Sequence, residues 1–254
     1  MNLSRFMADL HIHSTLSPCG SLDMSPRNIV SAAVKRGLDI IAVADHNSYE
    51  NAYYTGVIAM KGGVNFLYGI EVQSIEEVHI LAFFDSYEEL RSFGSIIYDN
   101  LPDVSNNPDY FGDQVVVDED DNIVKVEAKL LLNSTRLTLD EIVDLIKEYN
   151  GLAILSHVNA GYFSVISQLG FIPQNLSIDA VEVTCDISRS EINNVPGIGG
   201  RPIVTFSDAH YVGDIGRGYT VFFLKEVSVA EIKKALGNLE GRSYEVYGQK
   251  GRIL

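Results

Sequence analysis

The chain has little of what marks secreted or membrane-spanning proteins. Its 254 residues include two cysteines, Cys19 and Cys185, which are too few for a disulfide framework and fit the reducing cytosol. No apolar run approaches the ~18 residues that cross a bilayer, and the N-terminus lacks the basic stretch and apolar stretch of a signal peptide. We therefore expect a cytoplasmic protein with no membrane partner.

Positive charge is also scarce. Lysine and arginine number 19 against 34 acidic residues, so the formal net charge is -15. Non-specific nucleic-acid binding depends on clustered basic residues facing phosphates, and the composition argues against tight binding of this kind. Bound cations can reverse the field inside the site of an acidic protein, so a small phosphorylated substrate remains compatible with this charge. The composition leaves the oligomeric state open.

Short apolar runs alternate with helical patterns along the chain. The runs are rich in Val and Ile without clean alternation, as in strands buried on both faces: MADLHIH, LDIIAVADH, VNFLYGIEV, EVHILAFF, LAILSHV, DAVEVTC and PIVTFSDAH. Helical periodicity and capping residues predict helices at 26–36, 49–61, 86–100, 137–150, 162–169 and 229–237. This alternation predicts an α/β fold with a mainly parallel sheet. Polar residues ending so many runs favour a closed barrel with one shared pocket. No linker or repeat interrupts the chain, and we expect one domain over residues 1–254.

Two connections depart from this alternation. Too few residues separate Glu71 from His79 for a parallel crossover, which needs about a dozen. These two runs should form a hairpin that turns near residues 74–76 and sets His79 opposite Glu71. A second hairpin, with Asp121-Asn122 at its turn, is expected within an insertion near residues 101–136. The insertion is either a solvated decoration or a flap over the pocket that selects the substrate.

All six histidines fall in or at the end of these apolar runs: His11, His13, His46, His79, His157 and His210. Acidic residues accompany them at Asp9, Asp45, Glu71 and Asp208. Residues i and i+2 of a strand share a face, so the two histidines of LHIH converge, as do the two polar residues of SDAH. Histidine is the commonest metal ligand. Any one of these histidines alone could be a hydrogen-bonded core residue. Burying the whole set without a cation would be very costly, and the set therefore predicts a multinuclear metal site.

Together these motifs resemble the PHP (polymerase and histidinol phosphatase) superfamily of metal-dependent phosphoesterases. The resemblance runs through ADLHIHSTLSPCG, GLDIIAVADHNS, GIEVQ, VHILAFF, AILSHV and TFSDAH, roughly residues 8–217. It implies a distorted seven-stranded (β/α) barrel that holds two or three divalent ions, zinc, manganese or iron. Carried over by motif, the first ion would be held by His11, His13, Glu71 and Asp208. The second would be held by Glu71, His79 and His157, and a third would face His46 and His210.

The loop after HxH departs from the commonest pattern of the family. Where many members carry Asp or His, this chain reads SPCG. Cys19 either completes the third site, where a thiolate would favour zinc or iron over manganese, or is an ordinary loop residue. Asp9 and Asp45 are expected to orient ligand histidines rather than bind metal. Cys185 is expected in the core, with Glu182 near it as an orienting or helix-contacting acid.

The resemblance also bears on the reaction. His210 and Arg217 are the candidate catalytic residues. Arg217 either binds phosphate bidentately or is a solvated loop residue, and Arg189 could replace the Asp-Arg that related sequences often carry where this chain reads HVNA. We expect a metal-dependent hydrolase that cleaves a small phosphorylated metabolite or nucleotide with a metal-bridging hydroxide. The alternatives are a nuclease that trims short RNA or DNA ends and a catalytically silent metal-binding domain that acts through a partner.

Overall fold

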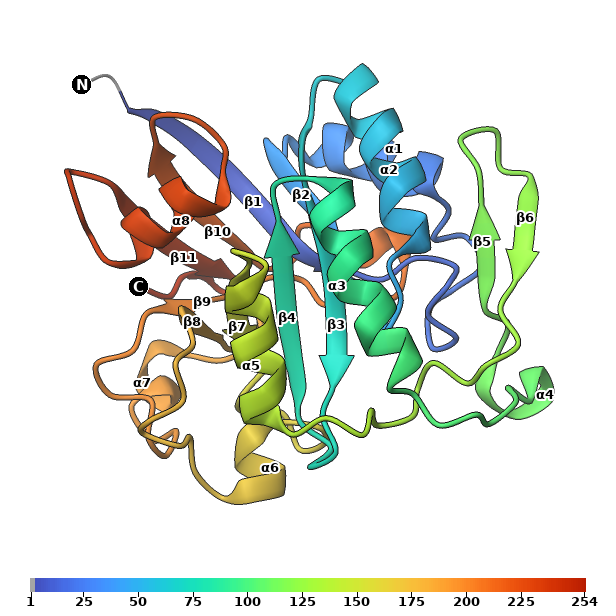
Figure 1. The fold of residues 1–254 in the computed structure, drawn as a ribbon. Helices are drawn as coiled ribbons and strands as arrows, with labels where there is room; N and C mark the ends of the chain where they lie inside the picture. The colour runs from blue at the N-terminus through green and yellow to red at the C-terminus, as the bar shows by residue number, and fades with distance from the viewer. Residues whose placement is uncertain (1–2) are drawn as a thin grey trace.

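The computed structural model describes residues 3–254, which form a curled mixed sheet with helices packed against it (Figure 1). The strands of this sheet are β1 (Ser4–Ile12), β2 (Ile40–Val43), β3 (Asn65–Gln73), β4 (His79–Phe84), β7 (Leu152–Leu155), β8 (Ala180–Glu182), β9 (Ile203–Val204), β10 (Tyr219–Leu224), β11 (Ser243–Gly248) and β12 (Gly251–Arg252). The helices are α1 (Pro26–Arg36), α2 (Glu50–Lys61), α3 (Tyr87–Asp99), α4 (Pro108–Phe111), α5 (Leu139–Glu148), α6 (Val165–Leu169), α7 (Arg189–Ile192), α8 (Val229–Leu236) and a 3₁₀ turn η1 (Val212–Asp214). Among the described helices, none has the length and hydrophobicity to span a bilayer.

Local signals explain where the helices begin and end. Before α1, the Ser25 side chain accepts the amide of Asn28, and Pro26 occupies the first turn. After it, Gly37 adopts a left-handed conformation with φ 72° and donates to Ala33 and Val34, a geometry that favours glycine. The helices α3 and α5 begin with reciprocal capping boxes. The helix predicted at residues 26–36 is confirmed with these same bounds.

The sheet order is β12-β11-β10-β1-β2-β3-β4-β7-β8-β9. Strands β1, β2 and β3 are parallel, as are β7, β8 and β9, and β4 runs antiparallel to both of its neighbours. The predicted α/β class is therefore confirmed. The mainly parallel sheet that we expected is not, because four strand pairs of the described sheet are parallel and five are antiparallel. The tail adds β10, β11 and β12 as antiparallel strands beyond β1.

The described strands do not form the closed seven-stranded barrel that we expected, because the tail strands extend the sheet beyond β1. Ser4–Ala8 of β1 pair with β10. This stretch of β1 is therefore not free to pair with β9 at the other end of the sheet. Only the far end of β1 approaches the other side of the sheet, where Ala209 donates to the His11 carbonyl at 3.2 Å and accepts from the His13 amide at 2.9 Å. The described chain thus forms a curled, half-barrel-like sheet whose two sides meet at one end.

The core holds the strands rigidly. Strands β2, β4 and β7 are buried along their full length. Helices α3 and α5 pack on the sheet through residues such as Phe93 and Ile142, α1 packs on β2 through Ile29, and α8 packs through Ile232 against Phe222. This packing fixes the strand ends that carry the polar residues.

The hairpin expected after Glu71 is confirmed, but its register differs. The turn is closed by the amide of Ser74 donating to the carbonyl of Val78. His79 therefore faces Gln73, and Glu71 faces Leu81. Because the shift is two residues, His79 stays on the same side of the sheet as Glu71.

The insertion contains the second expected hairpin, β5 (Val115–Val117) and β6 (Ile123–Val126). It stands apart from the main sheet on the right of Figure 1, beyond α2. Its first strand is held by the loop after β1, where Val115 donates to Thr15, and by α2, where Asn51 accepts from Val117.

Candidate metal centre

The candidate ligands gather at one end of the sheet. Parallel strands carry them near their C-terminal ends or in the loops that follow: His11, His13, His46, Glu71, His157, Asp208 and His210. His79 is the first residue of β4, and the opposite direction of that strand brings its start to the same end. The predicted convergence of these residues is therefore observed.

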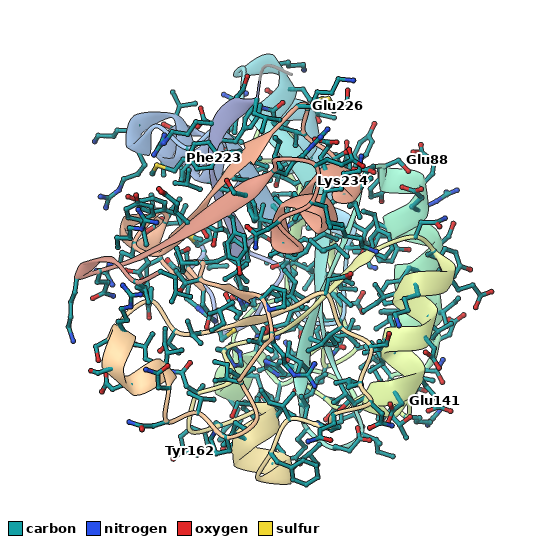
Figure 2. The ribbon with its side chains drawn as sticks, turned by 90° about the vertical axis from the view of Figure 1, so that its left-hand side faces the viewer. Glu88, Glu141, Tyr162, Phe223, Glu226 and Lys234 are labelled. Atoms are coloured by element: carbon teal, nitrogen blue, oxygen red, sulfur yellow. The ribbon has the colours of Figure 1, made fainter. Side chains whose placement is uncertain are left out.

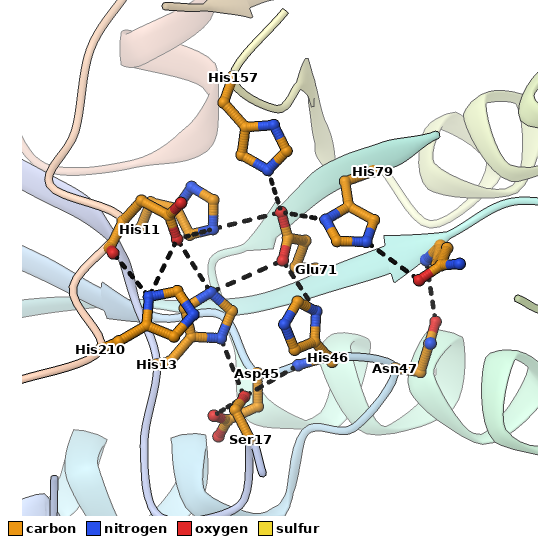
Figure 3. A network of polar contacts seen from close by, with 12 residues as sticks. His11, His13, Ser17, Asp45, His46, Asn47, Glu71, His79, His157 and His210 are labelled. Carbon is orange, nitrogen blue, oxygen red and sulfur yellow. Dashed lines mark hydrogen bonds and ion pairs between the residues drawn. The ribbon is translucent and has the colours of Figure 1, made fainter. Parts of the chain in front are cut away.

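Glu71 lies at the middle of this cluster and is 1% exposed (Figure 3). Five histidine nitrogens surround its carboxylate. Oε1 lies 3.3 Å from His11 Nε2, 3.2 Å from His79 Nδ1 and 3.3 Å from His157 Nε2, and Oε2 lies 3.0 Å from His46 Nδ1 and 3.6 Å from His13 Nε2. One carboxylate thus contacts side chains from the loops or strands of β1, β2, β4 and β7.

Asp208 is a second acidic centre. Its Oδ1 lies 3.3 Å from His11 Nε2 and 3.2 Å from His13 Nε2, and its carbonyl accepts from His210 Nδ1 at 2.9 Å. The potential ligand atoms form three ion-sized groups: His11, His13 and Asp208; His46, Glu71 and His79; and His13, His46 and His210. The second group contains His46 where the family resemblance implied His157. A β-bridge between His46 and Glu71 brings the two together.

The cluster fits divalent cations. His11 Nε2, His79 Nδ1 and both carboxylate oxygens of Glu71 are buried and make no hydrogen bond, a state that is costly without a cation. Burial alone would raise the pKa values of Glu71 and Asp208, but the histidines around them hold both well below their usual range. Burial lowers the pKa of His13 and His79, which favours the neutral imidazole that binds metal. The donor set, nitrogen with carboxylate oxygen, suits zinc, manganese or iron.

Supporting residues orient several of these ligands. Both oxygens of Glu182 contact His11 Nδ1, at 3.1 and 3.0 Å, and one accepts from the His157 amide at 2.9 Å. Gln73 Oε1 lies 3.1 Å from His79 Nε2. The expected orienting role of Glu182 agrees with these contacts. Gln73 was absent from the sequence-based set, since a glutamine at a strand end carries no distinctive signal.

Asp9 and Asp45 hold loops. Asp45 accepts from the Ser14 amide at 2.7 Å and from Ser17 Oγ at 2.7 Å, and the same Ser17 hydroxyl contacts His13 Nδ1 at 2.9 Å. Asp9 accepts from backbone amides of the loops after β9, and burial raises its pKa to about 6. Asp45 therefore positions His13 through the hydroxyl of Ser17. Asp9 binds backbone amides and contacts no candidate ligand through these bonds.

Four residues at or beside this site have a strained backbone. Asn47, His157, Phe163 and Asp208 adopt φ values of 48°, 27°, 53° and 49°, a region that residues other than glycine rarely occupy. Surrounding contacts hold them there. For example, Asn47 donates to the carbonyls of residues 131 and 133 and accepts from the Gln73 amide. Strain retained in this way is characteristic of functional sites.

Cys19 lies beside the third group. Cys19 is an exposed residue that lines the same cavity as His46 and His210. Desolvation of its thiol would raise the pKa, but the two neighbouring histidines lower that pKa to about 6. The thiol is therefore close enough to both histidines to act with them. Cys185 is half-buried and packs against the backbone at Gly218 and Gly248, away from the candidate ligands.

Two arginines are not brought to the cluster. Arg217 follows η1, pairs with Asp214 at 2.5 Å and is about half exposed. Neither it nor Arg189 of α7 lines the cavity at the cluster. The tight turn in which the Arg217 amide donates to the Asp214 carbonyl keeps its side chain within its own loop.

A cavity of about 380 Å³ opens onto the cluster. Its outer wall includes Leu132, Tyr162 and Phe163. Tyr162 lies at the surface beside α6 (Figure 2), and Phe163 stacks on His79 with ring centroids 4.9 Å apart. From the insertion only Leu132 reaches this wall, and the β5–β6 hairpin contributes none of the lining residues. The arrangement agrees with the decoration alternative for the hairpin rather than with a flap.

Solved structures share this fold. Endonuclease Q of Pyrococcus furiosus, a lesion-specific endonuclease, superposes with a TM-score of 0.71 and 21% sequence identity, over 95% of this chain and 58% of that one. A two-domain protein of Bacteroides vulgatus with a PHP-like metal-dependent phosphoesterase domain superposes with a TM-score of 0.58 and 16% identity, over 98% and 66%. The chain thus spans less than two thirds of the length of each.

Sequence comparisons identify relatives and a family. The protein MJ1587 of Methanocaldococcus jannaschii is 25% identical over 195 residues, which is 74% of this chain and 86% of the relative. The protein YqxK of Bacillus subtilis is 22% identical, over 94% of this chain and 64% of the relative. The PHP domain model matches residues 9–172 and the PHP-associated model residues 192–240. Since the first match covers more than half of the sequence, the chain belongs to the PHP domain family, the superfamily of metal-dependent phosphoesterases.

Proposed function

We propose that this protein hydrolyses the phosphoester bond of a small phosphorylated metabolite or nucleotide at the cluster around Glu71. The observation that carries the proposal is a buried carboxylate contacted by five histidine nitrogens, with both of its oxygens lacking a hydrogen bond. Glu71 would be the residue shared by two divalent ions. The complete set of ligands also speaks against a catalytically silent domain.

The residues divide into three candidate sites. The first comprises His11, His13, Glu71 and Asp208, and the second comprises Glu71 and His79 with His46 and His157 within reach. The third comprises His13, His46 and His210, with Cys19 beside them. Bound divalent ions would polarise the phosphoryl oxygens and supply a hydroxide nucleophile near neutral pH.

The chain itself contributes orientation and a proton. Glu182 and Gln73 hold the rings of His11 and His79, which fixes the positions of the ligand nitrogens. Although burial disfavours its charged form, hydrogen bonding to Cys19 and the charge of Asp208 raise the pKa of His210 to about 9. His210 lines the cavity and is therefore our candidate for protonating the leaving oxygen when the third site is empty.

The cavity favours a compact substrate. None of its described lining residues is lysine or arginine, so phosphate charge has to be neutralised by bound ions and histidines. The net charge of -15 disfavours a long row of phosphates across the surface. A second candidate, nuclease activity, is supported by the fold shared with endonuclease Q at a TM-score of 0.71.

Metal reconstitution tests both candidates. Chelator-treated protein is reloaded separately with Mn²⁺, Zn²⁺ or Fe²⁺ and assayed against phosphorylated metabolites, nucleotides and labelled oligonucleotides. We expect phosphate release from small phosphoesters that is lost in Glu71→Gln. Cleavage of oligonucleotides alone would establish the nuclease, and no metal-dependent hydrolysis of either class would refute the proposed function.

A further inference from the structure

A second cavity adjoins the metal-centre cavity. It measures about 610 Å³ and lies among the loops after β7 and β8, the helices α6 and α7, and Lys250. Ala160 and Thr184 line both cavities. These two residues thus stand at the boundary between the metal-centre cavity and this second space, which we call the adjoining cavity.

The boundary between the two cavities is well fixed. Asn159 donates to Thr184 Oγ1 at 2.7 Å, and the Thr184 amide donates to Asn159 Oδ1 at 2.9 Å. This reciprocal pair ties the loop after His157 to the loop after Glu182. Because Thr184 Oγ1 accepts the Asn159 bond, its own hydroxyl proton can still be donated to a ligand.

The adjoining cavity offers uncommitted polar groups beside apolar ones. Within residues 3–254, the side chains of Asp186, Asn194 and Lys250 form no hydrogen bond or ion pair. Ile187 and Val195 supply apolar surface. Donors and acceptors set around an apolar wall match a polyhydroxylated ring, whose hydroxyl groups both donate and accept while its faces are less polar.

Charge narrows the choice of ligand. Asp186 and Glu191 provide two carboxylates against the single ammonium group of Lys250. The adjoining cavity is therefore net acidic and disfavours a ligand group that carries a further phosphate. An uncharged hydroxyl-rich group meets no such repulsion.

We infer that the adjoining cavity is the subsite for the alcohol portion of the substrate, and that this portion is an uncharged polyhydroxylated group such as a sugar or the ribose of a nucleoside. The inference rests on the proposed function. During hydrolysis the oxygen of water bonds to phosphorus, the bond from phosphorus to the alcohol oxygen breaks, and that oxygen takes up a proton. Phosphate is then left at the metal centre and the alcohol in the adjoining cavity.

Two neighbouring exposed asparagines provide a matched test. Asn194 lines the adjoining cavity, whereas Asn193 does not. Tryptophan at position 194 should fill the space, and Asn193→Trp serves as the control. Relative to p-nitrophenyl phosphate, kcat/KM for glucose 6-phosphate and adenosine 5′-monophosphate should fall at least about tenfold in Asn194→Trp, since a filled pocket loses most ligand contacts. Asn193→Trp should keep the wild-type ratio, and equal ratios in both variants would overturn the subsite.

Binding without turnover separates the subsite from the proposed function. Calorimetry with glucose and with adenosine should detect binding to wild type and Asn193→Trp that is weakened in Asn194→Trp. If these ligands bind in this pattern while no phosphoester is hydrolysed, the proposed function fails and the binding subsite stands. If p-nitrophenyl phosphate is hydrolysed while neither glucose nor adenosine binds, the subsite fails and the proposed function stands.

The charge argument has its own test. Wild type should prefer fructose 6-phosphate to fructose 1,6-bisphosphate, because the second phosphate would approach Asp186 and Glu191. Asp186→Asn removes one of these charges at nearly constant volume and should reduce the preference several-fold. A wild-type preference for the bisphosphate would overturn the assignment of an uncharged alcohol.

Discussion

At the residue scale, Glu71 joins the candidate ligands into one cluster. Replacing it with Gln keeps the shape but removes the charge that would hold two ions together. We expect bound metal to fall from at least two ions to about one or fewer per chain, and turnover to fall at least about 100-fold. Elemental analysis and activity measure these losses, while circular dichroism should report an intact fold. A Gln variant that keeps two ions would show that Glu71 is not the bridge.

The two cysteines should behave differently. Cys19 lines the metal-centre cavity with His46 and His210, whereas Cys185 packs near the tail strands. Because a thiolate favours zinc or iron over manganese, Cys19→Ser should shift the activity ratio toward manganese, and Cys185→Ser should leave it unchanged. Activities after separate reconstitution with each metal check this. If both variants keep the parent profile, Cys19 is only a loop residue.

At the scale of elements, the β5–β6 hairpin is fixed away from the candidate site. Its acidic tip is held by Arg27, which bonds to Asp120 and to the Glu119 carbonyl. Replacing residues 118–122 with Asn-Gly should change kcat/KM for small phosphoesters by less than about twofold, since the tip lines no part of the cavity. Stability should change little, because an exposed ion pair contributes about 0–1 kcal/mol. A tenfold change in kcat/KM would restore the flap alternative.

Helix α8 is clamped to the segment before β11 by a buried ion pair. Glu231 accepts from Arg242 Nη2 at 2.8 Å and Nε at 2.9 Å, and this pairing lowers the pKa of Glu231 from 4.5 to about 2. The stabilisation is complete above pH 4.5 and is lost as pH falls toward about 2. Urea unfolding should therefore show a shallower loss of stability over this range in Glu231→Gln than in wild type.

The exposed Glu226 provides the control for this clamp. Glu226→Gln should follow the wild-type dependence of unfolding free energy on pH. If Glu231→Gln and wild type lose stability in parallel between pH 4.5 and about 2, the clamp does not set the acid response.

The sequence predicts elements well where the signal is local. Ser25, Pro26 and Gly37 define the ends of α1 within a few residues. The hairpin after Glu71 follows from the shortness of its loop, but its register depends on how Ser74 bonds across the turn, which composition does not specify. The short helices α4 and α7 lack enough turns to produce a helical period and were not predicted.

The candidate site is predictable for a different reason. Its histidines and acids recur at strand ends, so their convergence follows from the strand–helix alternation. The structure places Arg217 away from the cluster, because sequence proximity to a strand end does not reveal its local pairing with Asp214. The closed barrel was predicted but not found, because β10 pairs with β1. These two strands are separated by most of the sequence, and no local pattern predicts their pairing.

At the scale of the whole molecule, the net charge of -15 should determine which phosphorylated substrates approach the candidate site. Small phosphoesters should have a much higher kcat/KM than single-stranded oligonucleotides, because a chain of this charge offers few basic groups to displace the counterions of a row of phosphates. Added salt screens this repulsion, because the Debye length shortens to about 3 Å at 1 M, so the preference should shrink as salt rises. Competition assays over a salt series measure it, and a preference for oligonucleotides at low salt would favour the nuclease.

The contact of Ala209 with His11 and His13 has a consequence for folding kinetics. It joins two segments separated by most of the chain, and contacts of such long sequence separation carry a large closure entropy and form late. His11, His13 and Asp208 should come together only after these Ala209 hydrogen bonds have formed. Partly folded chains should therefore have little affinity for the ion that these three residues would hold. Metal should consequently slow unfolding far more than it speeds folding, and the amide hydrogens of His13 and Ala209 should exchange with solvent much more slowly once the ion is bound.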